Sequence, residues 1–165
     1  MMSEIKKEIE RKYLLKRMPD INSSEILHIK QFYISSEPEI RVRSDGKNFY
    51  LCKKGKGMLI REETETLISE EVVNILVLLR NGIVIEKQRY KLNSNGYIWE
   101  IDNYLEPYIG LVIAEIELLY LQQEVVIPEC FELIAEVTYN KRFKNKLLAL
   151  QPISISELFK LAVGD

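Results

Sequence analysis

The chain has 165 residues, of which 47% are hydrophobic and 29% are charged, and its formal net charge at pH 7 is −2. This length suits a single domain over residues 1–165 with a sizeable core, and the composition excludes a disordered chain. No apolar run approaches the about 20 residues of a membrane-spanning helix, and the charge lacks the basic balance typical of nucleic-acid-binding proteins; we therefore expect neither kind of partner.

The rarer residue types narrow the possible chemistry. Cys52 and Cys130 lie far apart without metal-ligand spacing, which favours isolated thiols over a disulfide or a zinc site. His28 is the sole histidine, which excludes a multi-histidine metal site. The charged N-terminus lacks the apolar region of a signal peptide and predicts a cytoplasmic protein. Any catalysis would rely on carboxylates, lysines, arginines or tyrosines.

The first predicted element, residues 5–16, contains two acids and a lysine at every second position: Glu8, Glu10 and Lys12. On a β-strand this spacing places all three side chains on one face. The alternative is an exposed helix, with Ile5, Ile9 and Tyr13 at helical spacing. By itself the stretch favours the helix.

Seven later segments repeat the alternation and reverse that preference. In chain order these predicted strands span residues 26–36, 39–45, 47–54, 58–67, 83–93, 96–104 and 110–120. Turn residues separate them, and Asp45-Gly46 and Asn95-Gly96 are typical of hairpins. Three helices are also predicted, over residues 69–80 with Ser69 as N-cap, 128–137 and 154–162.

These elements predict a mainly β protein of the α+β class. Eight antiparallel strands can close into a barrel whose interior holds one small ligand. Because like charges two residues apart repel on an exposed face, we expect the charged faces to line the inside and the helices to pack outside. The alternative is that the charges form surface ion pairs between strands.

The ordered series of charged strands resembles the CYTH family, the triphosphate tunnel metalloenzymes, from about Glu8 to Ala149. The opening Glu-x-Glu-x-Lys is followed by Arg41-Val42-Arg43, the segment from Leu51 to Gly55, Arg61 with Glu63 and Glu65, Lys87-Gln88-Arg89, Glu100-Ile101-Asp102, Glu115-Ile116-Glu117, Glu136-Val137-Thr138, Arg142-Phe143 and Asn145. The family folds as an eight-stranded antiparallel tunnel, as the strand pattern predicts.

The resemblance implies roles for the charged residues. Those expected to bind the phosphates of a triphosphate are Lys12, Arg41, Arg43, Lys54, Arg61, Lys87 and Arg89. Those expected to hold Mg²⁺ or Mn²⁺ are Glu8, Glu10, Asp102, Glu115 and Glu117. Three further acids have alternative roles: they would bind a second metal, activate water or pair with neighbouring arginines. They are Glu63, Glu65 and Glu100. Lys54 is preferred to Lys53 because it shares a face with Cys52.

The expected reaction is metal-dependent attack of water on a terminal phosphoryl group. Lys12 and Tyr33 match the family's proposed base pair, although Tyr33 could instead only pack in the wall. Trp99 alternates out of phase with the acids and should face outward, which favours inorganic tripolyphosphate over thiamine triphosphate or ATP. Cyclase chemistry, nucleoside or thiamine triphosphate hydrolysis and a non-catalytic polyphosphate-binding barrel are the alternatives. A homodimer is favoured over a monomer.

Overall fold

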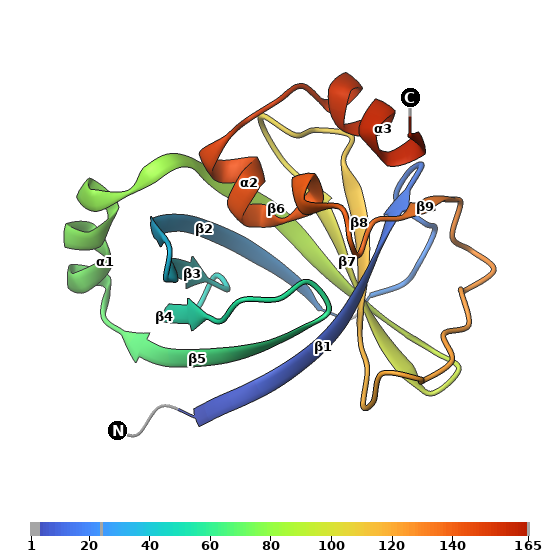
Figure 1. Ribbon diagram of the computed structural model, residues 1–165, viewed down its shortest axis with the longest axis horizontal. Helices are drawn as coiled ribbons and strands as arrows, with labels where there is room; N and C mark the ends of the chain where they lie inside the picture. Colours follow the sequence, from blue (N-terminus) through green and yellow to red (C-terminus); the bar gives the residue numbers. More distant parts are fainter. Residues whose placement is uncertain (1–3, 24, 165) are drawn as a thin grey trace.

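β-Strands dominate the computed structural model, which describes residues 4–23 and 25–164 (Figure 1). The strands are β1 (Glu4–Leu15), β2 (Ile26–Ser36), β3 (Glu39–Ser44), β4 (Phe49–Lys54), β5 (Ile60–Ile68), β6 (Asn81–Ser94), β7 (Tyr97–Tyr104), β8 (Val112–Glu117) and β9 (Leu133–Glu136). The helices are short: α1 (Glu70–Leu76), η1 (Val77–Leu79), η2 (Lys141–Phe143), α2 (Asn145–Leu150) and α3 (Ile155–Val163).

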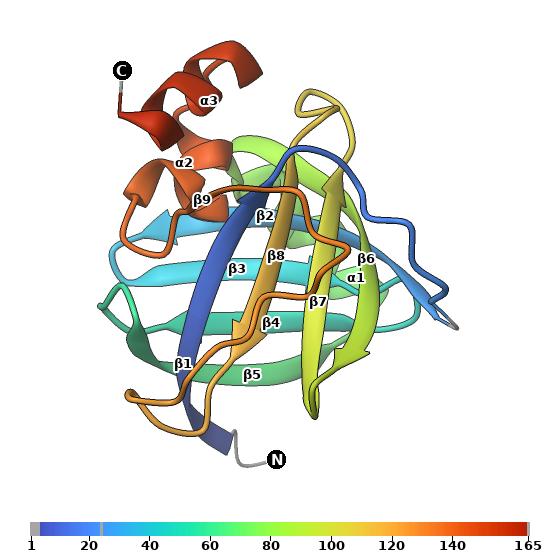
Figure 2. The ribbon, with the colours of Figure 1, turned by 90° about the vertical axis from the view of Figure 1, so that its right-hand side faces the viewer.

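The first eight strands close into an antiparallel barrel. Their order is β5-β4-β3-β2-β6-β7-β8-β1, and β1 also pairs with β5. β1 makes both closing contacts because its first half pairs with β5 and its second half with β8. Figure 2 shows β6, β7, β8 and β1 crossing in front of β2 to β5. The eight-stranded closed barrel predicted from the charge alternation is confirmed.

The β6–β7 hairpin turns where the sequence predicted it. Asn95 and Gly96 both have positive φ angles, 52° and 78°. A two-residue turn of this kind matches the right-handed twist of the flanking strands, and Asn-Gly adopts it at little steric cost. The turn sets a register in which Arg89 lies opposite Asp102 and Lys91 opposite Glu100, so it determines which charged residues become neighbours.

Two apolar clusters support the barrel. One fills one end of it, where Leu14, Tyr33, Ile85 and Tyr104 meet residues of α2 and α3 such as Leu148 and Leu158. The other covers the outer face of β1, β7 and β8, and it includes Tyr13, Trp99, Ile116 and Phe131. In Figure 2 the orange connection between β8 and β9 runs over this face. Trp99 therefore faces outward, as its phase predicted.

The predicted helix over residues 128–137 is wrong. Residues 133–136 form β9, which pairs with the end of β1 outside the barrel. The backbone N–H of Val137 donates to Lys12 and that of Lys16 donates to Glu132, so the segment satisfies an edge of β1 that β5 leaves unpaired. Arg11 adds a bidentate contact to Glu136, at 2.8 and 2.6 Å. These long-range hydrogen bonds to β1 outweigh the local spacing of apolar residues that predicted a helix.

The other two predicted helices are confirmed with shifted bounds. Ser69 caps α1 by accepting from the Val72 N–H, and η1 follows α1 directly. Ser154 caps α3 through a capping box with Glu157. The short α2 was not predicted, and it packs against β6 and β2. In the described part of the chain, no helix has the length and apolar character needed to cross a membrane.

Candidate active site

A charged cavity of about 1080 Å³ runs inside the barrel. All predicted site residues line it except Tyr33 and Asp102. Tyr33 lies in a smaller pocket at the end covered by α2, and Lys12 also lines that pocket. Asp102 is completely buried in the wall. The structure therefore brings together charges from β1 and from β3 to β8.

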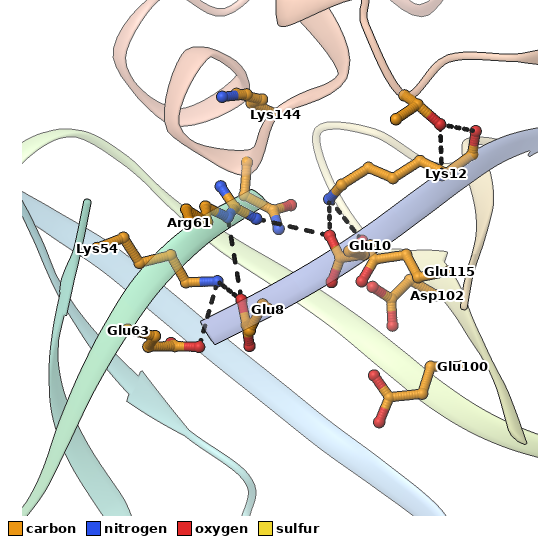
Figure 3. A network of polar contacts seen from close by, with 12 residues as sticks. Glu8, Glu10, Lys12, Lys54, Arg61, Glu63, Glu100, Asp102, Glu115 and Lys144 are labelled. Atoms are coloured by element: carbon orange, nitrogen blue, oxygen red, sulfur yellow. Dashed lines mark hydrogen bonds and ion pairs between the residues drawn. The ribbon is translucent and has the colours of Figure 1, made fainter. Parts of the chain in front are cut away.

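β1 presents alternate residues to the cavity, as expected of a strand. Glu8, Glu10 and Lys12 line the cavity, whereas Tyr13 packs in the outer cluster. Lys12 Nζ lies 2.7 Å from Glu115 Oε1 and 3.2 Å from Glu10 Oε1 (Figure 3). The strand interpretation of this stretch is confirmed and the helical alternative is wrong.

The pKa values of Lys12 and Tyr33 both lie above their ordinary ranges. Burial alone would lower the pKa of Lys12, but the carboxylates of Glu10 and Glu115 outweigh it and raise the pKa. Burial raises the pKa of Tyr33 to about 12, although Arg41 opposes the shift. Both groups are therefore protonated at neutral pH in this arrangement. Gln31 links Tyr33 to Arg41, because it donates to the Tyr33 hydroxyl at 3.4 Å and accepts from Arg41 at 3.5 Å.

The wall formed by β6, β7 and β8, here called the β6–β8 wall, is organised around Asp102. Its carboxylate accepts from Lys87 Nζ at 2.5 Å and from Arg89 Nε and Nη2 at 2.7 and 2.8 Å. Burial would raise the pKa of Asp102, but Arg89 and Lys87 hold it below the usual value. Arg89 also reaches Glu100 at 2.6 Å and Glu115 at 3.4 Å. Lys87 and Arg89 are thus held by buried or half-buried acids.

The opposite wall, formed by β3, β4 and β5 and here called the β3–β5 wall, pairs each base more loosely. Arg41 donates to Glu63 at 3.1 Å, and Arg43 donates to Glu65 at 2.8 Å. Lys54 lies 3.2 Å from Glu8 of β1 and 3.5 Å from Glu63. The Nε atoms of Arg41 and Arg43 are buried and have no hydrogen-bond partner among residues 4–23 and 25–164. These Nε–H groups are free to donate hydrogen bonds to an anionic ligand.

Lys54 is buried in the cavity wall, whereas Lys53 is exposed. Arg61 reaches both acids of β1, with Nε 3.9 Å from Glu8 and Nη2 3.5 Å from Glu10 (Figure 3). Glu117 lies at an exposed position of the cavity and pairs with Lys6 at 2.8 Å.

Carboxylate oxygens are the ligands that Mg²⁺ and similar hard cations prefer, and several of them line this one cavity. Among the described residues, one group of three has its ligand atoms within 4.8 Å of one another: Cys52, Glu63 and Glu65. Arg41 and Arg43 already donate to these two acids, and Cys52 donates to Glu65 at 3.2 Å. The carboxylates of Glu8, Glu10 and Glu115 lie on the adjoining strands β1 and β8 (Figure 3).

Lys144 is a further basic residue near the cavity, and the sequence did not predict it as a site residue. It precedes α2, lines the small end pocket with Arg61 and Lys12, and donates to the Gly57 carbonyl at 2.7 Å. Burial, and then the positive charge of Arg61, lower its pKa to about 8. The residue lies outside every predicted strand, so the charge alternation offered no signal for it.

The chain resembles proteins of known activity over most of its length. No family model matches it. A relative from Nitrosomonas europaea named inorganic triphosphatase is 33% identical over 150 residues, covering 87% of this chain and 97% of the relative. A second, from Acetivibrio thermocellus and of the same name, is 35% identical over 150 residues, covering 88% and 95%. The crystal structure of the inorganic triphosphatase NE1496 matches with a TM-score of 0.65 and 30% identity, covering 89% of this chain and 96% of that one.

Proposed function

This chain belongs to the CYTH family, the triphosphate tunnel metalloenzymes, and on that premise we propose that it hydrolyses inorganic tripolyphosphate to phosphate and pyrophosphate inside its barrel. The observation that carries the proposal is the cavity itself, whose wall holds both the bases that an anionic substrate needs and the acids that a divalent cation needs. The named relatives act on the same class of compound.

The bases of both walls would bind the phosphates. Arg41 and Arg43 each have a buried Nε without a partner in the described part of the chain, and an arginine can offer Nε and Nη to a phosphate in a bidentate contact. Lys12, Lys54, Arg61 and Lys87 would add compact or forked positive charge around the chain of phosphates. Arg89 would do so while remaining anchored to Asp102. These groups would stabilise the negative charge that develops on the bridging oxygen as pyrophosphate leaves.

Glu8, Glu10, Glu115 and Glu117 would hold Mg²⁺ or Mn²⁺, since their oxygens line the cavity beside the phosphate-binding bases. A bound cation would offset the repulsion between these acids and the substrate and polarise a phosphoryl oxygen. Asp102, which the resemblance implied as a metal ligand, would instead orient Lys87 and Arg89, because it does not line the cavity and its oxygens already accept from both. Glu63, Glu65 and Glu100 would orient Arg41, Arg43 and Arg89 in the same way.

Lys12 and Tyr33 would be the groups that transfer a proton during the reaction. With raised pKa values, both are proton donors in the arrangement described here, and Lys12 is placed to stabilise charge on a phosphate oxygen. A role as base for either group requires its pKa to fall when substrate and cation bind. Lys144, at the same end of the cavity, would bind a terminal phosphate while it is protonated.

The test is hydrolysis by the purified chain of tripolyphosphate, ATP and thiamine triphosphate, with Mg²⁺ or Mn²⁺ and with EDTA, and with separation of the products. We expect phosphate and pyrophosphate from tripolyphosphate and no turnover in EDTA. Binding without release would identify a non-catalytic barrel, and cyclic AMP from ATP would identify a cyclase. Glu8→Gln should abolish turnover, whereas Glu62→Gln, an exposed acid on β5, should not. Full activity in Glu8→Gln would contradict the metal assignment.

A second candidate, an organic triphosphate, is favoured by one observation. Part of the cavity wall is apolar and exposed, and it consists of Leu67, Ile98 and Leu119. Tyr50 lies beside them in the lining, with its ring 5.4 Å from the Arg43 guanidinium. Such a surface could contact a base or a thiamine ring, so the ratio of turnover on ATP to turnover on tripolyphosphate decides between the candidates.

A further inference from the structure

The segment from Glu70 to Arg80, which comprises α1 and η1 and is here called the α1 segment, is apolar on both of its sides. Val73, Leu76 and Val77 are half-buried, and η1 contacts β2. The other side exposes Val72 (39%), Ile75 (63%), Leu78 (80%) and Leu79 (59%) to solvent. A helix that is hydrophobic all round is normally buried, and a cluster of exposed apolar side chains is typical of an interaction site.

The α1 segment also has charges only at its ends. Glu70 and Glu71 begin it and Arg80 ends it, with no charged residue between them. Within the described part of the chain, none of the three forms an ion pair. In Figure 1 α1 lies at the opposite side of the molecule from α3, and none of the cavity-lining residues belongs to the α1 segment. The surface is therefore separate from the candidate active site.

We propose that the α1 segment is the interface of a homodimer, in which the segments of two copies pair antiparallel about a two-fold axis. In such an isologous interface each residue meets its counterpart reciprocally. Antiparallel pairing places Glu70 and Glu71 of one copy beside Arg80 of the other, and it packs the exposed apolar side chains between them. A parallel arrangement would instead bring acids against acids. Ile75, midway between Glu70 and Arg80, lies at the axis and contacts its own counterpart.

Sedimentation velocity over a range of concentrations tests the association. We expect a species of twice the chain mass of 19.4 kDa, and Ile75→Asp should raise the dimer dissociation constant by at least about tenfold because it places two carboxylates together at the axis. Ile109→Asp is the matched control, since Ile109 is similarly exposed (60%) but lies outside the α1 segment. A monomeric wild type, or a dimer unaffected by Ile75→Asp, would overturn the proposal.

A cross-link tests the two-fold geometry. In a Cys130→Ser background, which removes the exposed native thiol, Ile75→Cys should form a disulfide-linked dimer under mild oxidation and Ile109→Cys should not. Exchanging the end charges, with Arg80→Glu combined with Glu70→Arg and Glu71→Arg, should restore association that Arg80→Glu alone weakens. Equal cross-linking of the Ile75→Cys and Ile109→Cys variants would contradict the placement of Ile75 at the two-fold axis. Tripolyphosphate turnover should be unchanged in Ile75→Asp, so this result is independent of the proposed activity.

Discussion

The two walls of the cavity contain the same residue types but use them differently. On the β6–β8 wall, Asp102 is fully buried and binds both Lys87 and Arg89. On the β3–β5 wall, Arg41 and Arg43 each contact one acid, and their Nε atoms have no partner among the residues that the structure describes. Lys87 and Arg89 of the first wall are paired with acids of the same wall, whereas the second wall keeps hydrogen-bonding capacity for a ligand. The number of charged residues on each wall would not reveal this difference between the two walls.

The difference has an energetic basis. A buried base is costly without a counter-charge, so the β6–β8 wall depends on Asp102 for folding. An unpaired buried N–H also costs free energy, but a bound phosphate would recover that cost in each catalytic cycle. We therefore expect substitution of Asp102 to act mainly on stability and substitution of Arg41 or Arg43 to act mainly on turnover.

The largest expected effect is on folding, from Asp102→Ala. Removing this carboxylate leaves Lys87 and Arg89 without their shared partner, and we expect the free energy of unfolding to fall by about 3–5 kcal/mol. Glu65→Gln, which affects the half-exposed pair with Arg43, should cost less than about 1 kcal/mol. Urea unfolding followed by circular dichroism measures both, and equal losses would remove the distinction between the walls.

The next effect is on turnover, from Arg41→Ala. We expect kcat on tripolyphosphate to fall by about 10²–10³-fold, the usual loss when one stabilising donor is removed from a reacting centre. Arg41→Lys should restore little of it, because an ammonium cannot supply the paired Nε and Nη donors. Lys53→Ala, on the outward face of β4, is the control and should retain full activity. Rescue by the lysine variant would show that charge alone is needed.

A smaller effect concerns pH, through Lys144. Because burial and Arg61 lower its pKa to about 8, the side chain is charged below that pH and neutral above it. Its contribution to phosphate binding should thus be present below pH 8 and lost as the pH rises. We expect kcat/KM to decline through pH 8 in the wild type, whereas Lys144→Gln should start about tenfold lower and lack that decline. An identical pH profile in both proteins would exclude Lys144 from substrate binding.

The smallest effect should involve neither wall. Leu119→Ser changes the exposed apolar part of the cavity, so it should leave tripolyphosphate turnover and stability unchanged. If organic triphosphates bind there, kcat/KM for ATP should fall by about tenfold at most, the usual value of a small apolar contact. A parallel loss for both substrates would place Leu119 in the phosphate-binding machinery instead.

Much of this arrangement follows from local alternation. The period of two in Glu8-Ile9-Glu10 and in Glu115-Ile116-Glu117 assigns each side chain to one face of a strand, whatever its partner. The faces alone therefore predicted which charges line the cavity, as well as the choice of Lys54 over Lys53. The Asn95-Gly96 turn and the cap at Ser69 are likewise local, and both are confirmed.

Only the tertiary structure decided which charges meet and which are available to a ligand. Asp102 shares its strand face with Glu100, yet the closure of the barrel buries it between Lys87 and Arg89. Lys144 enters the site from a connection that no periodicity describes, and residues 133–136 became a strand because a distant edge of β1 needed partners. Register, closure and burial arise from contacts between residues far apart in the chain, whereas alternation acts between neighbours. The sequence therefore determined the faces of the strands, and the fold determined the pairs.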